Sequence, residues 1–430
     1  CVFTLRRLRT HPHRATKVLN RLNRALTAIR WGVLVTFIAS LLIVGWRQWL
    51  VGRIGDLVLM IDLLALAGPI ATMIFLWWAQ YPIDRRLREQ SLLRQIDDGE
   101  PIFSFHTRGQ FVMEQVRHQL LLVLVPMLVI VTWVQATDRL IDPDVVGEAG
   151  FIAITAAGGL VVFLLAPLMI RYLWRTVPMA AGSLRDRLLD MCRSHRVGVG
   201  ELLLWRTHGG LINGAVVGLF APLRYILLTD GLVDRLAESH IEAVMAHELG
   251  HVRRKHMPWL AVCAISTLGV MTAMVDGLLW ASDTLGWTER MRDLLATGGT
   301  GGSTGQLALL GTLMFAGLIG WAGVFGYISR RFERQADTFA VQHLTQTEQS
   351  ETITDTAAHT MAEALRAVSQ LNHHPTSRKS WRHGSIDWRV NYLRTLPGRP
   401  VDACPIDHQV KIICWSCAVL LIATAILQSI

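Results

Sequence analysis

Long apolar stretches alternate with polar ones along most of the chain. Seven of them resemble membrane-spanning helices, because a helix needs about 20 mostly apolar residues to cross a bilayer. They cover residues 31–51, 57–78, 118–134, 151–173, 259–280, 307–328 and 412–426. Trp residues stand at several of their ends, where interfacial aromatic side chains belong. The pattern predicts a predominantly α-helical polytopic membrane protein with about seven transmembrane helices.

The first apolar stretch, 31–51, has a signal peptide as its rival interpretation. It is too long for the apolar core of a signal peptide, and no small-residue cleavage site follows it. We therefore expect a membrane-spanning helix there.

The pattern changes after residue 174. Residues 183–194 have apolar side chains at helical spacing, and short strand-like runs follow at 197–205, 211–217 and 224–228. Another helix is predicted to begin near Glu238. These elements indicate a small α+β domain.

The predicted organisation has six parts. These are a basic segment (1–30), four transmembrane helices with a polar helical loop at 81–117 (31–173), a first domain part (174–258), two transmembrane helices with a Gly-rich loop (259–328), a second domain part (329–410) and a C-terminal transmembrane helix (411–430).

Composition supports a membrane environment, since 51% of the residues are hydrophobic and 15 are Trp. The net charge of +9 does not indicate a nucleic acid partner, because the basic residues cluster beside apolar runs. Segments 1–30 and 81–117 are rich in Arg, whereas 138–149 is acidic. Under the positive-inside rule the basic segments lie in the cytoplasm. We expect the lipid bilayer, and no nucleic acid, as a partner.

Two other motifs carry little weight. Cys414 and Cys417 form a C-x-x-C, but they lie inside an apolar stretch without the strand-turn-helix setting of a redox site. The Gly-rich run 298–305 has no strand before it and no Lys after it, so we interpret it as a linker and not as a phosphate-binding loop.

The strongest chemical motif is a complete H-E-x-x-H at residues 247–251. On a helix His247 and His251 stand one turn apart on the same face, so that both can bind one metal ion. Glu248 is then placed to take a proton from a water at the metal. His256 lies about 140° round a continuous helix from His251, which predicts a surface or supporting position and not a ligand. A solvated helix with two ordinary His is the alternative.

A hydrolytic zinc site commonly has two His, one carboxylate and an open position. Glu333, directly after the predicted span 307–328, is our choice for the carboxylate. Asp337, one turn later, could hydrogen-bond the outer nitrogen of a ligating His. A helix end with Arg/Glu pairs remains an equally good interpretation of this stretch alone.

Together the two stretches resemble the HtpX and CAAX prenyl protease family of integral-membrane zinc metallopeptidases, which pairs H-E-x-x-H with a later E-x-x-x-A-D. The matching residues here are His247-Glu248-Leu249-Gly250-His251 and Glu333-Arg334-Gln335-Ala336-Asp337.

The resemblance implies a small zincin-like metallopeptidase domain holding one zinc ion per chain. It implies that His247, His251 and Glu333 bind the zinc, that Glu248 is the general base, and that Asp337 supports a ligand.

Weaker similarities surround these motifs. Asn213-Gly214-Ala215 resembles the family's strand before the active helix, so Asn213 is expected to help bind substrate; Gly214 stands where the family often has Ala. His383, followed by Gly384-Ser385 and Arg389, resembles a late segment whose His would help stabilise the oxyanion, although Gly384 replaces a common Pro. His374, followed by Pro375, is a rival for that role.

The expected function is that of a membrane-embedded zinc endopeptidase in membrane protein quality control, with polypeptide substrates that are themselves membrane proteins. The expected location is a bacterial inner membrane, with the active site facing the cytoplasm. A CAAX-type processing protease and a catalytically silent scaffold with the same fold remain alternatives. Seven apolar stretches disfavour a soluble peptidase held by one or two anchors.

Overall fold

The computed structural model describes residues 15–55, 59–97, 107–286, 302–372 and 374–429. Within them the chain divides into two compact units. The first contains residues 1–178 and 203–209, and the second contains residues 179–202 and 210–430.

The first unit consists almost entirely of helices. Its elements are α2 (Ala15–Leu42), α3 (Trp46–Ile54), α4 (Met60–Asp97), α5 (Arg108–Gln115), the π-helical turn η2 (Val116–Leu121), α6 (Leu122–Leu140), α7 (Pro143–Val146), α8 (Glu148–Leu173), and the strand β1 (Thr176–Pro178). β1 pairs antiparallel with β2 (Glu201–Trp205), Thr176 opposite Trp205. Helix α5 starts at a capping box, in which the Thr107 hydroxyl accepts from the Gln110 N–H.

The first apolar stretch is divided in the structure. Helix α2 ends at Leu42, and the candidate span within it covers Arg21–Leu41, so it begins earlier than the predicted 31–51. Gly45 has φ +66°, a left-handed conformation that suits Gly and interrupts the helix. Residues 46–54 form the separate helix α3. Apolar content alone does not locate such a break.

The second unit combines helices with short strands. Its elements are α9 (Ser183–Ser194), β3 (Gly214–Val217), the 3₁₀ turn η3 (Ala221–Leu223), β4 (Tyr225–Thr229), α10 (Asp230–Arg235), α11 (Glu238–Arg253), α12 (His256–Thr284), α14 (Gly302–Thr347), α15 (Asp355–Leu371), α16 (Ile386–Leu393) and α17 (Pro405–Ser429). β3 pairs antiparallel with β4, Gly214 opposite Leu228. Every residue of β4 is buried, as expected for a strand with neighbours on both faces.

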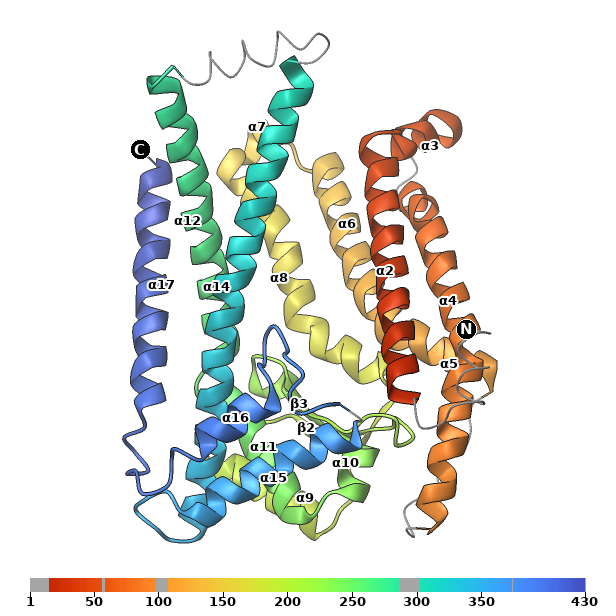
Figure 1. Ribbon diagram of the computed structural model, residues 1–430. Coiled ribbons are helices and arrows are strands. Elements are labelled where there is room, and N and C mark those ends of the chain that lie inside the picture. Colours follow the sequence, from red (N-terminus) through yellow and green to blue (C-terminus); the bar gives the residue numbers. More distant parts are fainter. Residues whose placement is uncertain (1–14, 56–58, 98–106, 287–301, 373, 430) are drawn as a thin grey trace. The chain divides into compact units, whose positions relative to one another are not determined.

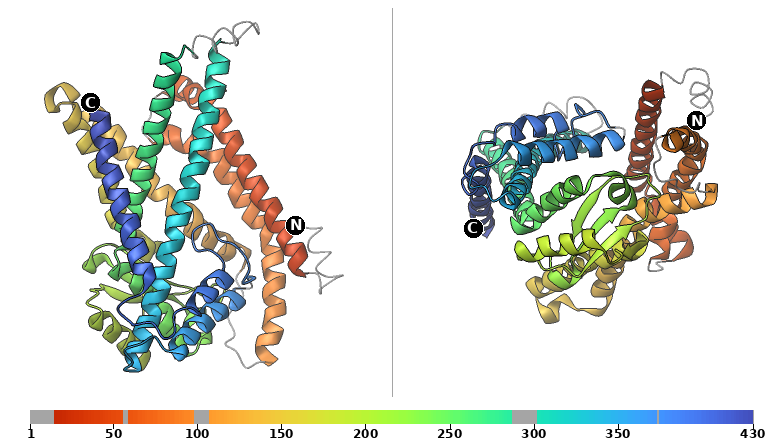
Figure 2. Two further views of the ribbon diagram at one scale, coloured as in Figure 1. Left: turned by 60° about the vertical axis from the view of Figure 1, so that its left-hand side comes forward. Right: turned by 90° about the horizontal axis from the view of Figure 1, so that it is seen from below.

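Among the described residues, six helices are long and apolar enough to cross a membrane. In the second unit α12, α14 and α17 pack side by side (Figures 1 and 2). The predicted span 307–328 lies inside α14, where the side chains of residues 302–314 fall outside the described part. The predicted linker 298–305 also falls partly outside it, and residues 302–305 are helical. The chain is a multi-pass membrane protein, mostly helical with a small mixed sheet, which confirms the predicted fold class.

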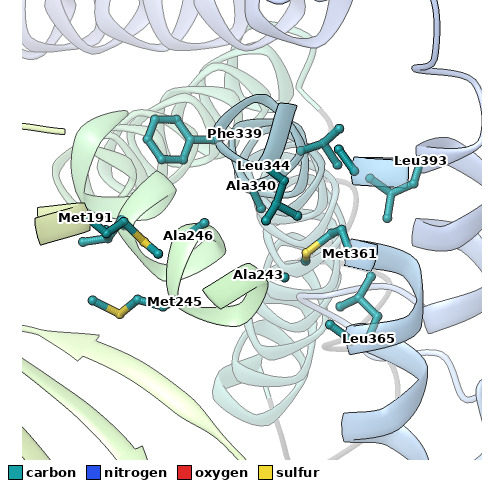
Figure 3. Close-up of a cluster of buried hydrophobic side chains, with 14 of the residues drawn as sticks. Met191, Ala243, Met245, Ala246, Phe339, Ala340, Leu344, Met361, Leu365 and Leu393 are labelled. Atoms are coloured by element: carbon teal, nitrogen blue, oxygen red, sulfur yellow. The ribbon is translucent and has the colours of Figure 1, made fainter. Parts of the chain in front are cut away.

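One hydrophobic core holds the second unit together. Side chains from α9, α11, α14, α15 and α16 meet around Ala243 and Ala246, and Figure 3 shows Phe339, Leu344 and Met361 packed in the same cluster. Small residues on α11 let the neighbouring helices approach closely. Helix α11, which carries the H-E-x-x-H, is thus surrounded by packed elements and has little freedom to move.

Candidate metal centre

The site forms where α11 crosses the C-terminal half of α14. Gly250 makes this crossing possible, because a Cβ there would stand 3.2 Å from the Cα of Ala336 and 3.1 Å from the Cβ of Phe339. Contacts that short are tighter than ordinary packing, so a Cβ at this position would push against both helices. Gly250 of the first motif therefore packs against Ala336 of the second, and this close contact brings the two motifs together.

Three side chains converge at this crossing: His247, His251 and Glu333. The Nε2 atoms of the two His are 3.2 Å apart, and the carboxylate oxygens of Glu333 lie 3.6 Å from His247 Nε2 and 3.7 Å from His251 Nε2. Tetrahedral ligands held about 2.0–2.2 Å from a zinc ion stand about 3.3–3.6 Å from one another. The spacing and donor types therefore fit zinc.

Glu248 lies on the strand side of α11. The backbone N–H of Val216 in β3 donates to its carboxylate. Gly214 of the same strand is close as well, since a Cβ there would stand 3.1 Å from Val244 Cγ1 and 3.9 Å from Glu248 Cγ. Burial raises the pKa of Glu248. A carboxyl whose pKa is raised toward neutrality takes up a proton more readily.

Asp337 and Arg389 stand behind His247. Asp337 Oδ1 is 2.9 Å from His247 Nδ1, so the outer nitrogen of the imidazole donates to a carboxylate and Nε2 is left for a metal. Arg389 binds both oxygens of Asp337, with Nε 2.8 Å from Oδ2, and its Nη1 lies 3.5 Å from Glu333. Arg389 thus fixes Asp337, which in turn orients His247.

His251 is supported differently. Its Nδ1 lies 2.8 Å from Nδ1 of His256, whose Nε2 lies 2.8 Å from Oε1 of Gln335. Gln335 donates through Nε2 to Asp407 at 2.6 Å, and Arg254 donates to the other oxygen of Asp407 at 3.3 Å.

If His251 binds metal through Nε2, the tautomers of His251 and His256 are both determined by this hydrogen-bond network. His251 Nδ1–H donates to His256, and His256 Nε2–H donates to Gln335. This hydrogen-bond network extends from the metal centre to Asp407 at the start of α17.

The sequence predicted a surface or a supporting position for His256, and the structure shows the supporting one. The estimate of 140° assumed a continuous helix, but α11 ends at Arg253 and α12 begins at His256. Lys255 between them has φ +55°, a left-handed conformation that turns the chain. This turn directs His256 back toward His251, where its ring is buried and stacks on Phe332 at 4.6 Å.

Charges around the site favour the ligating forms. Burial would raise the pKa of Glu333, but His383 and Arg389 lower it, so Glu333 stays a carboxylate. Burial holds the pKa of His251 well below its usual value, so this imidazole is neutral. For His247, burial is outweighed by Asp337, which raises its pKa and makes the imidazole a stronger donor to a metal.

Of the two late His, the structure brings His383 to the site. His383 Nδ1 lies 2.8 Å from Glu333 Oε1, and its side chain is 55% exposed, so it stands at the solvent side of the centre. The exposed His374 is held in a turn instead, because its backbone N–H donates to the Ser369 carbonyl and its carbonyl accepts from the Ser369 hydroxyl. Asn213 is exposed directly before β3, and its backbone bonds to Thr229.

These residues carry the components of peptide hydrolysis. A zinc ion held by His247, His251 and Glu333 would polarise the scissile carbonyl and make water more acidic. Glu248 is placed to accept the proton of the attacking water and to return it to the leaving amine. His383 can donate from the exposed side to an oxygen that gains negative charge.

The imidazole behind His251 supplies a test of this arrangement. His256→Ala is expected to weaken zinc binding about 10–100-fold, the usual cost of losing an outer partner of a metal ligand. His256→Gln, which keeps a hydrogen-bond acceptor, should recover part of the loss. His240→Ala, on α11 but outside the network, is the control. Zinc affinities measured by competition with a chelating dye check this, and equal affinities for His256→Ala and His240→Ala would contradict the supporting role.

Known proteins resemble this chain in sequence and in fold. Residues 209–396 match the model for peptidase family M48. Plastoglobule-localized metallopeptidase 48 of Arabidopsis thaliana is 37% identical over 69 residues, which cover 16% of this chain and 20% of that protein. The crystal structure of Ste24p from S. mikatae matches with a TM-score of 0.47 at 15% identity, over 88% of this chain and 84% of that one. The match to the plastoglobule-localized metallopeptidase thus spans about a fifth of that protein's length.

Membrane helices and a His-His-Glu centre define the class of integral-membrane metallopeptidases. The segment 209–396, which matches the model for peptidase family M48, carries all three residues of this centre.

Proposed function

We propose that this protein is a zinc-dependent endopeptidase that hydrolyses peptide bonds of membrane proteins. The observation that carries the proposal is the position of Glu248, held by the N–H of Val216 beside the cluster of His247, His251 and Glu333. A silent scaffold would not need a carboxylate at that point. In this assignment the three clustered residues bind one zinc ion, Glu248 is the general base, and Asp337 orients a ligand.

Substrate would bind as an extended strand. Among the described strands, β3 lies at the edge of the sheet and pairs with β4 on one side. A substrate segment added to the free side would run past Glu248, with Asn213 at one end of β3. Main-chain hydrogen bonds would supply most of the affinity, so we expect loose sequence specificity.

The site would face the cytoplasm, in a bacterial inner membrane. The support is the charge pattern: basic residues in 1–30 and 81–117, against the acidic loop 138–149. On this side the enzyme would meet damaged or surplus membrane proteins at the membrane surface, which suits a role in quality control.

The test uses the full chain in detergent with three substrates: an unfolded membrane-protein fragment, a prenylated C-terminal peptide and the same peptide without its prenyl group. We expect cleavage of the fragment at several positions, mapped by mass spectrometry of the products. Cleavage of the prenylated peptide alone would replace the proposal with the processing function, and cleavage of none by zinc-loaded protein would favour a silent scaffold.

A further inference from the structure

A cavity in the first unit is lined by none of the residues of the metal centre. It measures about 600 Å³, within the range of about 300–1,000 Å³ typical of small-molecule sites. Three arginines line it, Arg117, Arg175 and Arg206, together with His118, His208 and the single acidic residue Glu114. The cavity is therefore positively charged.

Three rings pack together where the segments that carry the arginines meet. Trp174 and Trp205 are stacked with ring centroids 4.0 Å apart, and His118 stands edge-on to them at 6.2 Å and 5.4 Å. Each ring belongs to a residue directly next to one of the arginines: 117 and 118, 174 and 175, 205 and 206. Three segments distant in sequence thus each contribute one ring to the stack and one guanidinium to the cavity.

The backbone around the cavity is unusual. Arg175 and His208 both have positive φ, +50° and +54°, although neither is Gly. Arg117 and His118 lie in the π-helical turn η2. Both features cost conformational energy and are found most often at functional sites. That they meet at one cavity indicates that its shape serves a purpose.

The cavity also has a defined position along the membrane helices. Arg175 follows the end of the candidate span Glu148–Leu173, and Arg117 directly precedes the uncharged apolar run 118–137 inside the candidate span Arg108–Leu140. Ends of spans lie at the level of lipid headgroups, where Trp is enriched. Basic pockets at this level suit phosphorylated headgroups.

We propose that this cavity binds a phosphate group at the membrane surface, as carried by the headgroup of an anionic phospholipid. The planar guanidinium presents paired N–H donors that match phosphate oxygens, and three of them around one cavity can bind from several sides. A bound lipid would tie the ends of two membrane helices to the β1–β2 pair, because Arg206 follows β2.

The test measures lipid binding to the full chain in detergent by native mass spectrometry. The probes are dioctanoyl phosphatidylglycerol, dioctanoylglycerol as the same tails without phosphate, and excess inorganic phosphate as a competitor. The site variant is Arg175→Gln/Arg206→Gln. The control is Arg21→Gln/Arg24→Gln, which removes the same charge from two equally exposed arginines on α2.

We expect one phosphatidylglycerol per chain, an affinity at least about tenfold lower in the site variant, and an unchanged affinity in the control. Cleavage of a soluble peptide should be the same in all three proteins. Competition by inorganic phosphate would show that the phosphate alone is recognised, and its absence would assign recognition to the whole headgroup; both outcomes support the site.

Equal losses in the site variant and the control, or equal binding of dioctanoylglycerol, would overturn the proposal. If the double variant has a lowered melting temperature, Arg206→Gln alone decides, since this side chain is exposed. Its affinity should still fall while that of Arg21→Gln does not, and equal affinities would overturn the site.

Discussion

Glu248→Gln is expected to lower kcat by about 10²–10⁴, the usual contribution of a general base, and to leave zinc content unchanged. Gln has the same shape and can still accept the Val216 N–H, but its amide cannot take a proton from water. In the proposed binding mode the substrate lies along β3, so KM should change little. Initial rates on an internally quenched peptide, with zinc measured in the same samples, check this.

Glu242→Gln is the matched control. Glu242 is on the same helix, and its carboxylate lies 3.1 Å from His343 Nε2, away from the metal centre. Its replacement should leave kcat within about twofold, as for most changes outside the reacting groups. If Glu248→Gln retained wild-type kcat, or if both variants lost it equally, Glu248 would not be the base.

Glu333→Gln is expected to remove zinc from the purified protein and activity with it. The amide carries no charge and is a poor zinc ligand, and Glu333 is the only carboxylate in the cluster that the described residues form. We expect a loss of affinity larger than the 10–100-fold caused by changes in outer partners. Inductively coupled plasma mass spectrometry of dialysed samples gives the zinc content.

The control for this variant is Glu363→Gln on α15, where the carboxylate pairs with Arg366 at 2.6 Å outside the centre. It should keep its zinc. Near-stoichiometric zinc in Glu333→Gln would mean that another residue supplies the third ligand.

The structure brings together His247, His251 and Glu333, which the sequence singled out as candidate metal ligands. Helical spacing pointed to the two His, and the need of a zinc site for a carboxylate pointed to Glu333, with the resemblance implying the same three residues. The reason that they meet is visible only in the structure: Gly250 and Ala336 allow two helices to touch.

The supporting residues were harder to predict. His256 reaches His251 only because the chain turns at Lys255, and periodicity cannot show where a helix stops. The contact of Arg389 with Asp337 joins residues from two separate elements, and no local pattern records it. The basic cavity likewise depends on three arginines from segments distant in sequence, and no local pattern shows that these segments meet.

The most direct test of the central claim is a zinc titration of the wild-type protein after chelation. The full chain is stripped with a chelator and dialysed, and zinc is returned in steps while cleavage of an unfolded membrane-protein fragment is followed. We expect no cleavage without zinc and full activity at one zinc per chain. Cleavage that persists in the stripped protein, or activity unrelated to zinc content, would contradict the account.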